Sequence, residues 1–149
     1  MPELQLGYKV TKSHNLTGDN VDLFTVTGVN RVTLMFGEVT TVVATTTTYL
    51  LRIKTDNVNL CAATTITTDA DGTMYLVTGD PAVILDGTGP TPVIRLAYAA
   101  GAFPHEDFVI GNAGGSCVIE SDTSGAGTGV ILWTVFYQPL EAGASIVAA

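Results

Sequence analysis

The densest local group of titratable side chains in this 149-residue chain is His105-Glu106-Asp107, in the stretch FPHEDF. Imidazole and carboxylate groups so close together raise the question of a metal site or an acid–base pair. Consecutive residues of a strand point to opposite faces, however, and the HExxH spacing of a helical zinc site is absent. The group follows Pro104, which favours a solvated loop. We therefore expect no metal or other cofactor here.

Three glycine-containing stretches resemble reactive or binding motifs. Asp69–Gly72 (DADG) begins like a calcium loop but lacks the further ligands that such a loop needs. Ser124–Gly129 (SGAGTG) lacks the Lys-Ser/Thr of a phosphate-binding loop. Gly114–Cys117 (GGSC) is not a nucleophile elbow, because Val118 stands where the second Gly belongs. The first is better interpreted as a hairpin turn and the second as a flexible hairpin loop, and the sequence predicts no enzyme.

The two cysteines, Cys61 and Cys117, are too far apart for a CxxC metal pair. Both have apolar neighbours and are expected to be buried, whether free or joined in one disulfide. A hydrolase with a dispersed site would need Cys117 or His105 to be accessible and reactive. The second histidine, His14, lies in the polar stretch KSHNLTGD and is expected in a turn.

Aromatic residues are concentrated in one apolar stretch, where a core role is expected for Trp133, Phe136 and Tyr137. Sugar-binding modules display aromatic side chains on a sheet face. Three tyrosines on separate predicted strands are candidates for such a platform: Tyr49, Tyr75 and Tyr98. A carbohydrate-binding module is therefore one alternative function.

Charge is sparse. Charged residues are 13% of the chain, about half the roughly 25% of a typical globular domain. The net charge is −8, and the six basic residues form no cluster, so neither nucleic acid nor an anionic membrane is an expected partner. The beginning of the chain does not resemble a signal peptide, and no apolar run is long enough for a membrane span. Low charge also fits a surface that neighbouring subunits cover.

The order of β-rich runs and turn residues predicts an all-β fold: one domain over residues 1–149, a β-sandwich or compact β-barrel with little or no helix. The Thr- and Val-rich stretch Gly37–Thr55 suits a pleated sheet, with Val inward and Thr outward. Gly129–Leu140, the most apolar run, is expected to be central or buried on both faces. The predicted strands are Asp22–Gly28, Arg31–Val43 with a bulge or bend at Gly37, Thr45–Thr55, Thr73–Gly79, Pro92–Ala100, Phe108–Gly111 and Ser116–Ser121. Asp69–Gly72 is expected to join a hairpin whose second strand is Thr73–Gly79.

Three stretches together resemble structural proteins of tailed bacteriophages, above all capsid decoration (head auxiliary, or cement) proteins. They are LFTVTGVNRVTLMFGEVTT, DGTMYLVTGD and the ending WTVFYQPLEAGASIVAA. The resemblance implies a non-enzymatic virion protein, made in the host cytoplasm, that binds the outside of a capsid in many copies. It implies two partners, the major capsid protein and further copies of the chain, with a trimer favoured. Tail or fibre proteins have a similar composition and layout and are the nearest alternative.

Such a protein would contact its neighbours through repeated weak interfaces. In the segment MPELQLGYKV, Leu4, Leu6 and Tyr8 alternate without an obvious partner in their own hairpin. We expect residues 1–11 to form an arm that contacts a neighbouring subunit by strand addition. Deletion of the residues before Lys9 should then abolish shell binding and leave the domain folded.

Overall fold

A computed structural model describes residues 6–45, 47–82 and 106–149. This described part is all-β and contains no helix, as the sequence predicts. The strands are β1 (Tyr8–Asn15), β2 (Asn20–Thr41), β3 (Thr48–Ile53), β4 (Val58–Asn59), β5 (Thr64–Thr65), β6 (Met74–Leu76), β7 (Phe108–Thr123), β8 (Val130–Pro139) and β9 (Ser145–Ala148). The predicted strand Pro92–Ala100 lies outside the described residues.

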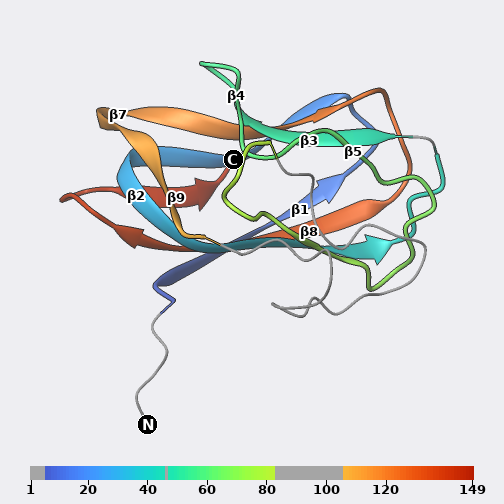
Figure 1. Ribbon diagram of the computed structural model, residues 1–149, viewed down its shortest axis with the longest axis horizontal. Helices are drawn as coiled ribbons and strands as arrows, with labels where there is room; N and C mark the ends of the chain where they lie inside the picture. Colours follow the sequence, from blue (N-terminus) through green and yellow to red (C-terminus); the bar gives the residue numbers. More distant parts are fainter. Residues whose placement is uncertain (1–5, 46, 83–105) are drawn as a thin grey trace, which may run out of the picture.

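Hydrogen bonds join the strands into one antiparallel sheet in the order β1-β8-β2-β7-β3-β4. The strands β6 and β9 also pair with β2, and β5 pairs with β3. The sheet is not closed, so the compact-barrel alternative is wrong, whereas the arrangement is compatible with a sandwich. Figure 1 shows two layers, with β3 and much of β7 in one and β1, β8 and the end of β2 in the other.

The strand β2 belongs to both layers. Its first part pairs with β7 and β9, and its last part pairs with β8 and β6. Between these parts it curves back on itself (Figure 1), and Gly28, where the register with β7 shifts, has a φ of +62°. In the neighbouring pair of Val29 with Gly111, a Cβ atom at position 111 would lie 1.9 Å from the Gly28 carbonyl oxygen, so β7 can approach β2 this closely only with a glycine at that position. The prediction that a strand ends at Gly28 is therefore wrong, because this glycine bends the strand without interrupting it.

Of the bulge or bend predicted at Gly37, the bulge is wrong. The register between β2 and β8 shifts between Val32 and Leu34 and again between Val39 and Thr41, and it is regular at Gly37. Gly37 lies opposite Trp133, and a Cβ atom there would be 3.1 Å from the indole ring. The glycine leaves the room that this large ring needs.

The turn predicted at Asp69–Gly72 is present, but the hairpin is not. Thr73 N–H donates to the Ala70 carbonyl, 3.0 Å away, and Gly72 has a φ of +86°. The flanking strands β5 and β6 pair with β3 and β2 rather than with each other. Similarly, the two short strands predicted within 108–121 are parts of the single strand β7.

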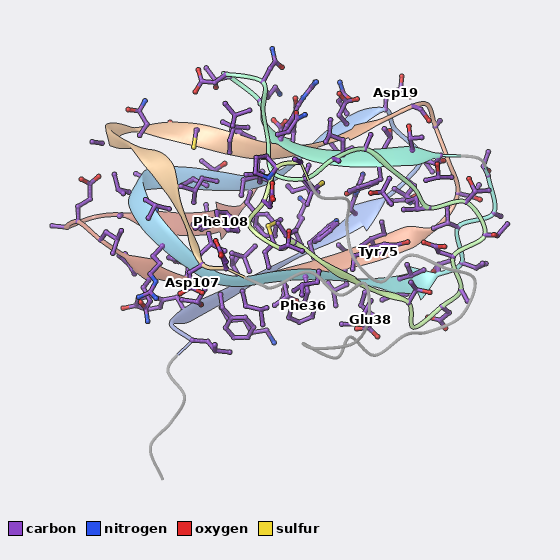
Figure 2. All side chains as sticks on the ribbon, viewed as in Figure 1. Asp19, Phe36, Glu38, Tyr75, Asp107 and Phe108 are labelled. Carbon is purple, nitrogen blue, oxygen red and sulfur yellow. The ribbon has the colours of Figure 1, made fainter. Side chains whose placement is uncertain are left out.

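The core lies between the layers. Tyr49 of β3 and Trp133 of β8 stack with ring centroids 5.9 Å apart, and Tyr75 (labelled in Figure 2) also packs against Trp133, with centroids 6.4 Å apart. Tyr137 is buried as predicted, with 7% exposure, but Phe136 is only half-buried and is not part of the core cluster. β8 is an inner strand between β1 and β2, yet its alternating burial shows that its two faces have different surroundings.

Candidate functional site

The structure fixes most of the predicted interaction segment against its own domain. Leu4 lies outside the described residues. The Leu6 carbonyl accepts a hydrogen bond from Thr33 Oγ1 at 2.5 Å. Tyr8 begins β1 and pairs with Tyr137 of β8, with ring centroids 5.7 Å apart. Tyr8 thus finds its partner in the distant strand β8 rather than in a hairpin, and its side chain is still 64% exposed.

The strand β1 lies at one end of the sheet order and, among the described residues, pairs with β8 alone. Just after β1, Leu16 N–H donates a hydrogen bond to the Gly129 carbonyl oxygen at 3.1 Å, and the Leu16 carbonyl accepts one from Gly127 N–H. Both backbone groups of Leu16 therefore point toward the segment that leads into β8. In an antiparallel ladder, alternate residues turn both backbone groups to the same side. The residues that turn theirs away from β8 are therefore Lys9, Thr11, Ser13 and Asn15. We call this backbone the β1 edge.

The side chains of these four residues are exposed as well. An unpaired edge is a template for an incoming strand, and lysine is one of the residues that proteins place there to limit unspecific pairing. Lys9 stands on this edge, and its Nζ lies 6.0 Å from the centre of the Phe136 ring. The β1 edge can therefore accept a strand by backbone hydrogen bonds, with a preference for an acidic or neutral one.

A buried polar cluster that the sequence did not reveal joins the four strands β1, β3, β7 and β8. His14 Nδ1 lies 2.7 Å from the Tyr49 hydroxyl, which also accepts a hydrogen bond from Trp133 Nε1 at 2.9 Å. Ser121 Oγ lies 3.4 Å from His14 Nε2. The prediction that His14 lies in a polar turn is wrong, because it occupies an inward position of β1 with 1% exposure. In the sequence, the only sign that residues of β1 alternate between the core and the solvent was a weak one, the step from charged Lys9 to apolar Val10.

The cluster combines a serine, a histidine and a tyrosine, which elsewhere act in nucleophilic catalysis. Burial, and to a smaller extent the positive charge of Lys12, lower the pKa of His14 from 6.5 to about 4. Burial likewise raises the pKa of Tyr49 far above its ordinary value. Because His14, Tyr49, Ser121 and Trp133 are all at most 1% exposed, no substrate reaches them, and the cluster stabilises the core.

Two of the three residues of the predicted titratable group, Glu106 and Asp107, are described, and each has a partner elsewhere in the fold. His105 lies outside the described residues. Asp107 forms an ion pair with Arg31 at 2.5 Å, and Glu106 N–H donates to the Thr78 carbonyl. Among the described residues, no group of three His, Cys, Asp or Glu side chains could hold a metal ion.

Both cysteines are free and buried, so no disulfide joins them. Cys61 is 1% exposed and its thiol accepts a hydrogen bond from Leu51 N–H. Burial raises its pKa to about 11 and also raises the pKa of Cys117. A thiol with a raised pKa and little exposure is a poor nucleophile.

The tyrosines proposed for sugar binding do not form an exposed platform. Tyr49 and Tyr75 are 0% exposed, and Tyr75 donates a hydrogen bond to Asp69 Oδ2 at 2.6 Å inside the core. Tyr98 lies outside the described residues. Two of the three candidate side chains are thus unavailable for stacking on a sugar.

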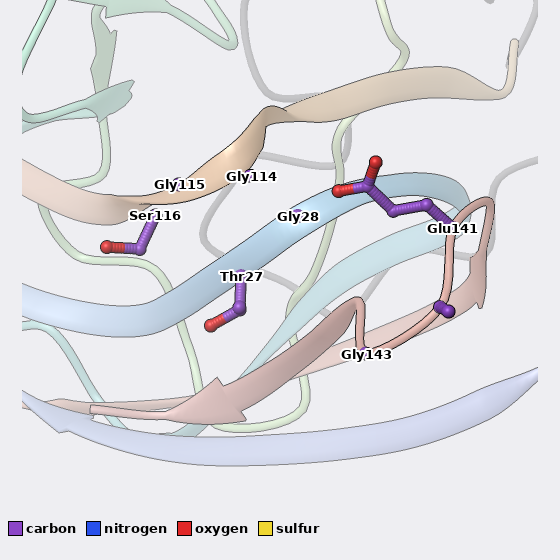
Figure 3. A pocket seen from close by; sticks show the side chains of 8 residues that line it. Thr27, Gly28, Gly114, Gly115, Ser116, Glu141 and Gly143 are labelled. Atoms are coloured by element: carbon purple, nitrogen blue, oxygen red, sulfur yellow. The ribbon is translucent and has the colours of Figure 1, made fainter.

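A groove of about 420 Å³ opens where β2 curves (Figure 3). Half of its lining residues are glycines; the eight are Thr27, Gly28, Gly114, Gly115, Ser116, Glu141, Ala142 and Gly143. Its carboxylate, Glu141, accepts a hydrogen bond from Val29 N–H at 3.0 Å and so holds the loop after β8 against β2. The groove offers few side chains that could select a ligand.

Comparison of the chain with protein-family models, curated proteins and solved structures gives no significant match. Within the ranges that the structure describes, no helix is long and apolar enough to cross a membrane. The candidate site that the geometry favours is therefore an interaction surface, the β1 edge with Tyr8 beside it.

Proposed function

We propose that the chain is a non-enzymatic structural protein of a tailed-bacteriophage particle. In this proposal it binds the outside of the capsid as a decoration protein and contacts the major capsid protein and other copies of itself. The proposal rests on the resemblance of its three quoted stretches to such proteins. The observation of the fold that best supports it is the β1 edge, which offers a row of backbone donors and acceptors.

Strand addition at the β1 edge would give affinity through backbone hydrogen bonds and would need no pocket. The residue at the start of this edge, Tyr8, adds a large apolar side chain that is 64% exposed. The many identical contacts of a shell would then compensate for the weakness of each one.

A proline scan of β1 tests this mode of binding. Thr11→Pro removes an N–H that points away from β8, which an edge strand tolerates. Val10→Pro removes one that points toward β8 and should unfold the domain. We expect the Thr11→Pro protein to keep its circular-dichroism spectrum and to lose binding to purified shells in a co-sedimentation assay. Full shell binding by a folded Thr11→Pro protein would exclude the β1 edge as the contact.

A shorter deletion than the one considered above tests the predicted arm. Removal of residues 1–5 takes away Leu4 and keeps the hydrogen bond between the Leu6 carbonyl and Thr33. If Leu4 contributes to the contact, shell affinity falls while thermal stability stays unchanged.

The proposal as a whole is tested by quantitative mass spectrometry of purified virus particles from the source. A copy number comparable to that of the major capsid protein is expected. A few copies per particle would place the chain in the tail or a fibre, and its absence from all particles would refute the virion assignment.

A further inference from the structure

The strand β1 is attached to the core of the domain by a single buried side chain. Of its eight residues only His14 is buried, and none belongs to the core cluster, although half-buried Val10 packs against it. Tyr8 and Lys12 also contact the domain, but neither is buried. Among the described strands, β1 pairs with β8 alone. An edge strand with so little buried surface opens more easily than the centre of a sheet, so the attachment of β1 depends on the state of His14.

Three side chains around His14 fix which of its ring nitrogens carries the proton. Trp133 Nε1–H is a donor only, and it donates to the Tyr49 hydroxyl oxygen at 2.9 Å. The Tyr49 O–H must then find an acceptor, and His14 Nδ1 lies 2.7 Å away. Nδ1 is therefore the bare nitrogen, and Nε2 carries the proton toward Ser121 Oγ, 3.4 Å away. This chain of hydrogen bonds requires a neutral imidazole.

A second proton on His14 has no partner in this arrangement. An Nδ1–H would face the Tyr49 O–H, so the Tyr49 oxygen would have to accept a second hydrogen bond and its own proton would lose its acceptor. The other groups that face the ring do not compensate, because Ser121 on β7 is neutral and Ile131, the cross-strand partner on β8, is apolar. The charge that acts on the ring, that of Lys12 on the same strand, is positive. None of the ion pairs between described residues includes His14, so its imidazolium is far more stable in water than in the core.

We propose that protonation of His14 releases β1 from β8 and from the core while the other strands stay paired, so that β1 is an acid-sensitive strand. The remaining sheet can stay folded because β8 keeps its pairing with β2 and the core cluster contains no residue of β1. Release removes the β1 edge and uncovers the edge of β8 in its place, so acid changes which strand ends the sheet. The inference does not depend on the virion assignment.

The expected pH range follows from the imidazole in its two states. The pKa of His14 is 6.5 in a released strand and about 4 in the core, where burial and, to a smaller extent, Lys12 lower it. Between these values a released strand binds the proton and a docked strand does not, so release becomes easier as the pH falls from 6.5 toward 4. The ratio of released to docked chains should therefore rise roughly a hundredfold between pH 7 and pH 4.

Amide hydrogen exchange of the full chain, followed by NMR, tests the release. The Val10 and Lys12 N–H groups point toward β8 and are protected while β1 is docked. After correction for the intrinsic pH dependence of exchange, we expect their protection factors to fall roughly a hundredfold between pH 7 and pH 4. At both pH values they should lie below those of the β2–β7 ladder, because release of β1 does not open that ladder. His14→Gln, which cannot take up the proton, should remove the fall, and the matched control His105→Gln should keep it.

The hydrogen-bond chain is tested separately in the natural protein, without any variant. The nitrogen chemical shifts of the His14 ring at pH 7 should show a proton on Nε2 and a bare Nδ1. This measurement and the exchange of the natural chain at the two pH values still test the inference if His14→Gln fails to fold.

Three results would overturn the inference. One is a proton on Nδ1 at pH 7, and another is protection of the β1 amides that does not change between pH 7 and pH 4. The third is equal protection of the β1 amides and the β2–β7 ladder, which would mean that only the whole domain opens. Shell binding is measured at neutral pH, where β1 is docked, so each of these results leaves the proposed function standing.

Discussion

His14 makes the stability of the fold sensitive to acid. The pKa of this side chain is 6.5 in the absence of burial and about 4 in the fold, where it lies 2.7 Å from the Tyr49 hydroxyl. Because the folded pKa is the lower one, the unfolded chain binds the proton more tightly. The stabilisation is therefore complete above pH 6.5 and is lost as the pH falls toward 4.

The difference between the two pKa values corresponds to about 3 kcal/mol once the pH is below 4, and to about 2 kcal/mol at pH 5. Urea unfolding at pH 7 and pH 5 measures this loss. Trp133, the single tryptophan of the chain, reports on it by fluorescence because it lies in the core beside Tyr49.

Two variants separate His14 from the carboxylates that also titrate in this range. His14→Gln keeps a hydrogen-bonding side chain but cannot titrate, so it should be less stable at pH 7 and lose about 2 kcal/mol less between pH 7 and pH 5. His105→Gln should behave as the natural chain does. If His14→Gln retains the full pH dependence, or if the NMR signal of His14 titrates near pH 6.5 in the folded protein, the reasoning is refuted.

Three further predictions concern the core. Gly37→Ala should destabilise the fold by about 1–3 kcal/mol, since its methyl group would lie 3.1 Å from the Trp133 ring; an unchanged melting temperature would show that the ring can move away. Tyr75→Phe removes the buried hydrogen bond to Asp69 and should cost about 1–3 kcal/mol in urea unfolding, and a neutral effect would mean that water replaces the hydroxyl. The Cys61 thiol, with a pKa of about 11 and 1% exposure, should not react with a thiol reagent until urea unfolds the chain, so rapid labelling of the native protein would contradict its burial.

The sequence was sufficient to predict the fold class, because Val and Thr alternate and turn residues recur too often for helices. In β2, for example, Val39 is buried and Thr40 is exposed, as the alternation predicts. The path of β2 could not be predicted. A glycine that ends a strand and one that bends it look alike in sequence, and at Gly28 the difference depends on the approach of Gly111 from β7.

The candidate surfaces were predictable to different degrees. The N-terminal segment was predicted to contact a neighbouring subunit, which stays a prediction; its pairing with β8 joins residues far apart in sequence and left no local signal. The outward side of β2 was hidden for another reason. In RVTLMF, apolar residues follow one another, so Leu34, Met35 and Phe36 gave no indication of which of them point into the core.

The pairing of β1 with β8 also bears on how the chain folds as it is made. Tyr8 pairs with Tyr137, so the strand that leaves the ribosome early receives its partner only when synthesis is nearly complete. Contacts between such distant segments form slowly, because a long loop must close first. Until then both sides of β1 are unpaired and can meet other nascent chains on the same messenger. Misassembly during translation therefore competes with the pairing of β1 with its own β8.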